Sequence, residues 1–194
     1  EELATPEAFA RDPRRVWEWY YWRREMIAAA APNAGHMALA EWERRRAGFT
    51  LITQNVDGLH DRAGSRRVRK LHGDIWISRC TGCTYQFLDR KTAGKGVPAC
   101  PECGAALRPG VVWFGEALPP LVWDDAQRAV HDADLLVVAG TSAQVYPAAG
   151  LIDMARSAGA ATMEINLEAT PYSGRVDVSV RGACGAVLAE LVGK

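Results

Sequence analysis

Two short segments contain the residue types best suited to chemistry. The first, Leu51-Ile52-Thr53-Gln54-Asn55-Val56-Asp57, is an apolar run that ends in polar side chains, and the second is Leu71-His72-Gly73-Asp74. An apolar strand with polar residues at its carboxyl end is typical of the edge of an open parallel sheet, where ligands bind. His72 follows a short predicted strand at 68–71, and histidine side chains titrate near neutral pH. The sequence therefore predicts that chemistry takes place here, with His72 able to exchange a proton.

Four of the five cysteines form two Cys-x-x-Cys pairs, Cys80 with Cys83 and Cys100 with Cys103, separated by sixteen residues. Four thiolates at this spacing are typical of a tetrahedral structural zinc site of the zinc-ribbon type. Two disulfides are the alternative, which a cytosolic chain disfavours. Because a four-thiolate site has no open coordination position, the zinc would hold structure and take no part in the reaction.

Composition limits the classes of protein to consider. The chain has 194 residues, of which 48% are hydrophobic, so it can bury a real core. Its formal net charge is zero and it shows no dense Lys/Arg face, which disfavours a nucleic-acid partner. No apolar run approaches the roughly 20 residues of a membrane span, and no signal peptide opens the sequence. We therefore expect a soluble cytoplasmic protein; a monomer is the default expectation for its oligomeric state.

An aromatic-rich helix carries a candidate anion-binding pair. Asp12-Pro13 predicts the start of this helix and Pro32-Asn33 its end, with a second helix over 34–47. Tyr20 and Arg23 are spaced at i and i+3, so they project from the same face and could together hold one anionic group. The alternative is that the aromatic and arginine residues of this helix only pack or face solvent.

The rest of the chain predicts an α/β fold. Strands alternate with helices and end in Gly, Ser, Thr or Asn, a pattern typical of a parallel sheet with a ligand along its carboxyl edge. The expected elements are a strand and bend at 109–116, strands at 134–142, 161–166 and 176–180, and helices at 121–131, 147–157 and 184–192. The predicted fold is a Rossmann-like domain formed by 1–74 and 108–194, including the helical segment 13–47, with a zinc-ribbon insert at 75–107.

Six motifs in order resemble those of the sirtuins, the NAD-dependent protein lysine deacylases. They are Gln54-Asn55-x-Asp57, Leu71-His72-Gly73, the paired Cys-x-x-Cys, Val112-x-Phe114-Gly115-Glu116, Gly140-Thr141-Ser142-x-x-Val145-x-Pro147 and Glu164-Ile165-Asn166. Within that family the chain resembles the class III, desuccinylase-type branch, because Tyr20-x-x-Arg23 follows Ala4-Thr5-Pro6. The resemblance implies an enzyme that transfers the acyl group of a modified lysine to ADP-ribose and releases nicotinamide. Acyl-lysine proteins or peptides would be its partners, and succinyl, malonyl and acetyl groups its acyl substrates.

The resemblance also assigns roles to residues that would contact NAD. His72 would be the general base, a role worth roughly 10²–10⁴ in rate, with a purely structural histidine as the alternative. Gln54, Asn55 and Asp57 would contact the nicotinamide-side ribose and the carboxamide. Gly140, Thr141 and Ser142 would line the phosphate and ribose region, Asn166 the adenosine ribose, and Gly182 with Cys184 the adenine end. A plain core residue is the alternative for Cys184.

On the substrate side, the resemblance assigns Tyr20 and Arg23 to the carboxylate of succinyl-, malonyl- or glutaryl-lysine. Ala4 matches a small residue that leaves room for these longer acyl groups. Val112, Phe114, Gly115 and Glu116 resemble the strand that pairs with the substrate backbone, which would be recognised by β-augmentation.

One feature of the sirtuins does not occur in this sequence. Sirtuins open with a strand and a glycine-rich loop that cradles the pyrophosphate, and these 194 residues contain neither; we expect them to be either part of a longer protein or a natural remnant. The resemblance therefore predicts an incomplete Rossmann half for these 194 residues. Two alternatives stay open: an ADP-ribosyltransferase on the same scaffold, and a peptide-binding module without catalysis.

Overall fold

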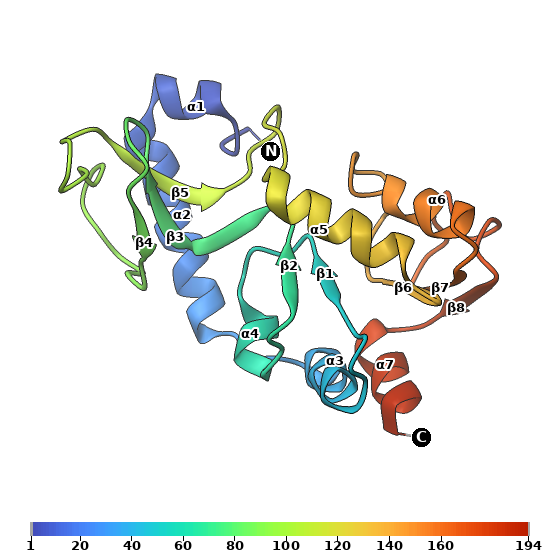
Figure 1. Cartoon of the computed structure of the whole chain (residues 1–194). Helices are drawn as coiled ribbons and strands as arrows, with labels where there is room; N and C mark the ends of the chain where they lie inside the picture. The colour runs from blue at the N-terminus through green and yellow to red at the C-terminus, as the bar shows by residue number, and fades with distance from the viewer. Residues whose placement is uncertain (1, 194) are drawn as a thin grey trace. The chain divides into compact units, whose positions relative to one another are not determined.

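The structure is a computed structural model that describes residues 2–193. The helices and strands follow one another along the chain (Figure 1) as α1 (Pro6–Arg11), α2 (Pro13–Ala29), α3 (Ala34–Arg45), β1 (Leu51–Thr53), α4 (Leu59–Ala63), β2 (Val68–Lys70), β3 (Gly73–Cys80), β4 (Gln86–Leu88), β5 (Leu107–Val111), α5 (Pro120–His131), β6 (Leu135–Ala139), α6 (Gly150–Ser157), β7 (Ala161–Asn166), β8 (Val178–Arg181) and α7 (Cys184–Gly193). None of the helices within 2–193 is long and apolar enough to cross a bilayer.

The chain divides into two compact units. Unit 1 comprises the described residues up to Ala31 together with Thr53–Leu59 and Lys70–Pro120. Unit 2 comprises Pro32–Ile52, His60–Arg69 and the described residues from Leu121 onward. The mixed α/β fold with a parallel sheet is confirmed. The domain boundaries proposed from the sequence, at 75 and 107, stay a prediction, and the compact units divide the chain at other points.

Unit 1 is built on α2, whose start the sequence predicts. Asp12 caps the helix, because its carboxylate accepts a hydrogen bond from the backbone N–H of Arg15 at 3.0 Å, and Pro13 takes the first position. Trp17 and Tyr20 lie on the buried face of α2, with 0% and 1% of their surface exposed. The indole N–H of Trp17 donates to the carbonyl of Leu107 at 2.8 Å, which fastens α2 to β5.

The sheet of unit 1 is antiparallel, in the order β4-β3-β5. Arg79 pairs with Arg108 and Cys80 with Leu107, so the first cysteine pair begins where β3 ends. The strand and bend predicted at 109–116 agree with the structure, in which β5 ends at Val111 and a turn and bend occupy 114–116. A turn follows because the N–H of Trp113 donates to the carboxylate of Glu116 at 2.8 Å, and the N–H of Glu116 donates to the carbonyl of Trp113 at 3.0 Å.

Arg24 is fully buried in unit 1. Its guanidinium donates to the Asp89 carboxylate at 2.9 Å and to the carbonyl of Ile75 at 2.8 Å. The hydroxyl of Ser78 donates to the same carboxylate at 2.7 Å. A buried charge is tolerated only when paired and hydrogen-bonded, and this group meets both conditions. The network ties α2 to β3 and to the segment that follows β4.

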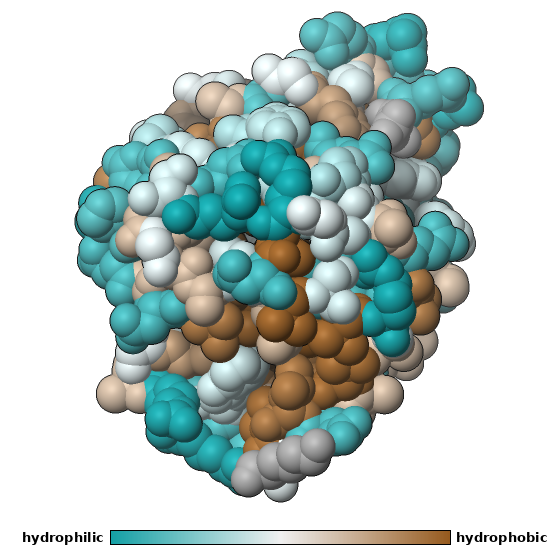
Figure 2. All heavy atoms as spheres, turned by 90° about the vertical axis from the view of Figure 1, so that its right-hand side faces the viewer, coloured by the Kyte–Doolittle hydropathy of each residue, from teal (hydrophilic) through white to brown (hydrophobic). Residues whose placement is uncertain are grey.

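Unit 2 contains a parallel sheet in the order β6-β7-β8. Ile165 of β7 is fully buried against Ala38 of α3 and Leu188 of α7. Helices α3 and α7 approach closely at two glycines, because a Cβ on Gly35 would lie 3.0 Å from the Cα of Gly185. Hydrophobic residues gather on the face of unit 2 that carries β8 and α7 (Figure 2), and both elements contribute exposed apolar side chains, Val178 and Leu191.

Most predicted boundaries agree with the structure to within a few residues, and β7 agrees at both ends. The helix predicted at 147–157 begins later, at Gly150, because turns occupy 146–149. The strand predicted at 176–180 is β8, at Val178–Arg181. The sequence did not predict α1, α4, β4 or most of β3.

Candidate active site

The polar segment that follows β1 is held by backbone and indole contacts in unit 1. The N–H of Asn55 donates to the hydroxyl of Thr53 at 3.1 Å, and the N–H of Leu59 donates to the carboxylate of Asp57 at 2.8 Å. The indole N–H of Trp76 donates to the carbonyl of Asp57 at 2.7 Å. Residues 54–57 are thus fixed from β1 on one side and from β3 on the other.

His72 lies against this segment. Its Nδ1 is 3.1 Å from the carbonyl oxygen of Gln54. A carbonyl only accepts hydrogen bonds, so Nδ1 carries the proton and the lone pair of the neutral ring lies on Nε2. The backbone of His72 is fixed as well, since its carbonyl accepts from the N–H of Val112 at 2.9 Å. The arrangement gives His72 the tautomer that a general base acting through Nε2 requires.

A cavity of about 400 Å³ opens beside residues 54–57. Two segments of unit 1 line it, and the lining residues are Trp22, Arg23, Met26, Ile27, Gln54, Asn55, Val56 and Asp57. The structure therefore brings Arg23 to the same cavity as Gln54, Asn55 and Asp57. The resemblance assigned Arg23 to the acyl carboxylate and the other three residues to NAD.

The predicted Tyr20 and Arg23 pair is adjacent, but its two members have different surroundings. The guanidinium of Arg23 lies over the ring of Trp19, with its carbon 4.9 Å from the centroid, and 5.8 Å from the Tyr20 centroid. Tyr20 is buried, and its hydroxyl accepts a hydrogen bond from the indole N–H of Trp113 at 2.9 Å. Burial raises the pKa of Tyr20 above its ordinary value. The phenol therefore stays neutral at pH 7 and keeps its own proton to donate.

The segment proposed to pair with substrate is a turn. The N–H of Phe114 donates to the carbonyl of Ala4 at 2.9 Å, while the side chain of Phe114 is exposed. Gly115 has φ 86°, a conformation that favours glycine. Arg108 holds the Glu116 carboxylate through two N–H groups at 2.5 and 2.9 Å. Burial raises the pKa of Glu116, but these hydrogen bonds outweigh it and lower the pKa below its ordinary value.

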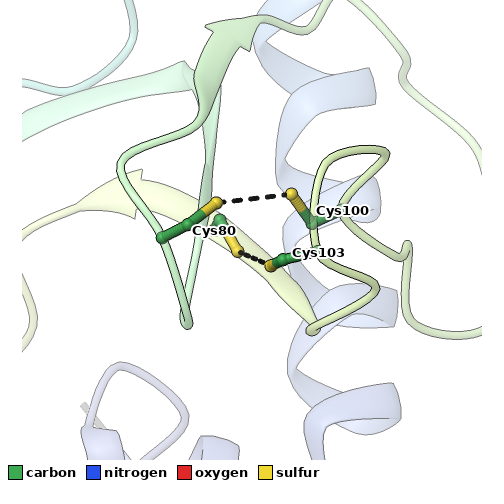
Figure 3. Close-up of side chains that lie close together, drawn as sticks. Cys80, Cys100 and Cys103 are labelled. Atoms are coloured by element: carbon green, nitrogen blue, oxygen red, sulfur yellow. Dashed lines mark hydrogen bonds between the residues drawn. The ribbon is translucent and has the colours of Figure 1, made fainter.

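The four predicted metal ligands converge (Figure 3). Their sulfur atoms all lie within 4.8 Å of one another. The Cys80 and Cys103 sulfurs are 3.4 Å apart, and those of Cys83 and Cys100 are 3.7 Å apart. Tetrahedral Zn–S bonds of about 2.3 Å place sulfurs about 3.8 Å apart, whereas a disulfide requires about 2.0 Å. The spacing fits a zinc ion and does not fit two disulfides.

A second group of predicted residues lies in unit 2, at the carboxyl ends of β6 and β7. The side-chain N–H of Asn166 donates to the carbonyl of Thr141 at 2.9 Å, and the carbonyl of Asn166 accepts from the N–H of Gly182 at 3.0 Å. Gly140 has φ 64°, and a Cβ there would lie 3.3 Å from the sulfur of Cys184. Burial raises the pKa of Cys184, so its thiol stays neutral. Ser142 is exposed next to this group.

Several residues that hold these groups in place have no role predicted from the sequence. Trp113 binds Tyr20, Trp76 binds Asp57, and Arg108 binds Glu116. Glu164 belongs to one of the six motifs but has no predicted role of its own. The sequence does contain a signal that could have pointed to Glu164, because its carboxylate lies between apolar residues in a predicted buried strand. A buried carboxylate requires hydrogen-bond partners that offset the cost of its burial.

A family model described as "Sir2 family" matches residues 1–147, most of the chain. The chain belongs to the Sir2 family. Among its Sir2 relatives, the Archaeoglobus fulgidus protein named NAD-dependent protein deacylase 1 is 53% identical over 194 residues, which covers 99% of this chain and 79% of that protein. A solved Sir2 homologue in complex with NAD matches with a TM-score of 0.97 and 52% identity, covering 100% of this chain and 76% of that one.

A more distant Sir2 structure, described as Sir2Tm bound to a propionylated peptide, matches with a TM-score of 0.91 and 29% identity over 99% of this chain and 83% of that one. The Sir2 fold is thus retained across relatives whose sequences differ at most positions.

Proposed function

We propose that this chain is an NAD-dependent protein-lysine deacylase that releases nicotinamide, transfers the acyl group to ADP-ribose and accepts acidic acyl groups. The names of its Sir2 relatives and the NAD and acyl-peptide complexes of its structural neighbours support the reaction class. The observation that carries the proposal is the cavity in unit 1 that Arg23 shares with Gln54, Asn55 and Asp57, beside which His72 is held by Gln54.

His72 would act as the general base. The hydrogen bond from Nδ1 to the Gln54 carbonyl orients the ring and leaves Nε2 to take a proton from a ribose hydroxyl during acyl transfer. The bond joins His72 to the segment that would contact NAD, so the base and the ribose would be positioned by the same backbone.

The residues proposed to contact NAD as co-substrate form a separate group in each unit. In unit 1, Gln54, Asn55 and Asp57 would contact the nicotinamide-side ribose and carboxamide. In unit 2, the proposed contacts are Gly140, Thr141 and Ser142 for the phosphates and ribose, Asn166 for the adenosine ribose, and Gly182 with Cys184 for the adenine. The bonds that Asn166 makes to Thr141 and Gly182 support a shared role for this second group.

Arg23 and Tyr20 would select the acyl group. The guanidinium at the cavity offers a charge-assisted bond to a succinyl or malonyl carboxylate. The proposed second donor, the neutral phenol of Tyr20, is 1% exposed and is not among the residues that line this cavity. Ala4 would leave room for the longer acyl chain. The acyl-lysine peptide would lie along Val112, Phe114, Gly115 and Glu116.

The four cysteines would hold one structural zinc ion per chain. Because all four positions of a tetrahedral ion would be filled by thiolates, the metal would not contact substrate.

The test is an assay of succinyl-lysine and acetyl-lysine peptides with NAD labelled in its adenosine part. We expect label in small acyl-ADP-ribose and release of nicotinamide, with His72→Asn reducing turnover at least about 100-fold. His131→Asn is the matched control, because His131 is exposed and its Nδ1 pairs with the neighbouring Asp132. Label on protein would favour an ADP-ribosyltransferase, and peptide binding with neither NAD binding nor turnover would favour a peptide-binding module.

A further inference from the structure

Strand β7 of unit 2 presents a row of polar side chains on one face. Thr162, Glu164 and Asn166 alternate with Met163 and Ile165, which pack in the hydrophobic core on the other face. Successive side chains of a strand point to opposite faces, so the three polar residues share one side. The chain from β7 to the parallel strand β8 contains no helix, only turns and bends over 167–177. Polar contacts to this face of β7 therefore help to hold the 167–177 segment in place.

Glu164 is the centre of these contacts, although only 2% of its surface is exposed. One carboxylate oxygen accepts from Ser173 at 2.6 Å, from Ser179 at 2.8 Å and from Arg181 at 3.1 Å. The other oxygen accepts from the hydroxyl of Thr170. These four donors come from the 167–177 segment and from β8, so one side chain fixes both.

The bonds extend into the backbone of the segment. The N–H of Thr170 donates to the hydroxyl of Ser173 at 2.8 Å, and the N–H of Tyr172 donates to the hydroxyl of Thr170 at 3.1 Å. Burial raises the pKa of Glu164, but hydrogen bonds from Ser173, Thr170, Ser179 and Arg181 outweigh it and lower the pKa to about 2. The carboxylate is therefore ionised at any working pH, and it holds the segment as an anion.

Glu164 is also next to residues proposed to contact NAD. Asn166 is the next residue on the same face of β7, and it pairs in register with Arg181, which Glu164 binds. Gly182 follows Arg181 and donates its N–H to Asn166. We propose that Glu164 is a positioning residue for the adenosine end of NAD, acting through Arg181 and the 167–177 segment on Asn166 and Gly182. This inference rests on the proposed function.

The test compares Glu164→Gln with wild type in steady-state kinetics. The amide cannot accept at its nitrogen and loses the charge-assisted bond to Arg181, so we expect the KM for NAD to rise about tenfold. The kcat and the KM for the peptide should stay within about twofold, because the adenosine end is remote from the reacting carbon. Thr170→Val with Ser173→Ala removes two of the same bonds from the other side and should shift the KM for NAD in the same direction.

Glu43→Gln is the matched control. Glu43 is also a buried carboxylate of unit 2, but it lies outside the β7 row and accepts from the backbone N–H groups of Arg66 and Arg67. Its substitution should lower the melting temperature without changing the KM for NAD. An unchanged KM for NAD in Glu164→Gln, or an equal rise in Glu43→Gln, would overturn the inference. If wild type shows no turnover, the proposed function fails. Calorimetric titration with ADP-ribose then still tests the inference, because Glu164→Gln should bind ADP-ribose more weakly than wild type does.

Discussion

Two adjacent arginines of α2 have opposite surroundings, and residue type alone does not distinguish them. Arg23 lines the cavity beside residues 54–57, whereas Arg24 is fully buried against Asp89, Ser78 and Ile75. The periodicity of a helix places them about 100° apart, so one faces the core and the other does not. The sequence left open whether Arg24 packs or faces solvent, and the structure shows that it packs.

Arg23→Met should depress desuccinylation far more than deacetylation. A hydrogen bond to a charged group is worth about 1.5–3 kcal/mol, so the ratio of the two kcat/KM values should fall by one to two orders of magnitude. Peptides that differ only in the acyl group provide the measurement. Equal losses on both substrates would contradict the assignment of Arg23 to the acyl carboxylate.

Arg24→Met should destabilise the fold instead of altering substrate choice. Removing one partner of a buried pair leaves an uncompensated charge on Asp89 and costs about 3–5 kcal/mol. Urea unfolding measures the loss, and Arg24→Met combined with Asp89→Asn should recover part of it. A loss below about 1 kcal/mol would mean that the pair is not buried as described.

At the scale of elements, β3 and β5 position His72 through a glycine. Gly73 has φ 78°, and a Cβ there would lie 2.2 Å from the carbonyl oxygen of Gly110. Contact at that distance is impossible, so any larger residue must push β3 and β5 apart. His72 precedes this glycine and bonds to Val112 just beyond β5.

Gly73→Ala should therefore lower both stability and turnover. Gly96→Ala is the matched control, because Gly96 has φ 73° but a Cβ added there would meet no atom within 4 Å. We expect Gly96→Ala to cost about 1–2 kcal/mol from backbone strain alone, and Gly73→Ala to cost more and to reduce kcat. Thermal unfolding and the deacylation assay give both quantities. Similar effects of the two substitutions would show that the contact with Gly110 is unimportant.

Elements with a strong hydrophobic pattern were predictable from the sequence, and those held by other forces were not. Strand β7 matches at both ends because the apolar residues Met163 and Ile165 alternate with polar residues along it, a pattern typical of a strand. By contrast, β4 is a three-residue strand with two exposed ends, and it is held by pairing with β3. The site residues were predictable to a similar extent. His72 and the cysteines were recognised by residue type and spacing. The bond from Trp113 to Tyr20 was not predictable, because it joins residues 93 positions apart and no local pattern in the sequence indicates such a contact.

At the scale of the whole molecule, the zinc site should matter beyond its own ligands. Chelation should release one zinc ion per chain and unfold the segment between the cysteine pairs, since small zinc modules derive about 10–16 kcal/mol from the metal. Asp89 lies in that segment and is the partner of Arg24, so α2 should lose a buried contact and activity should fall. Metal analysis, proteolysis and the deacylation assay should change together. Cys83→Ser should behave like the chelated protein, whereas Cys184→Ser, the control, should retain its zinc. Full activity of the metal-free chain would contradict a role of the zinc site beyond its own ligands.

The two compact units are each assembled from three separate stretches of chain that alternate along the sequence. The backbone therefore passes from one unit to the other five times. Neither unit can be cut out or expressed as a single continuous fragment, and a gene encoding only one of them would need new joins at several points. We therefore expect the two units to be inherited, synthesised and recombined only together.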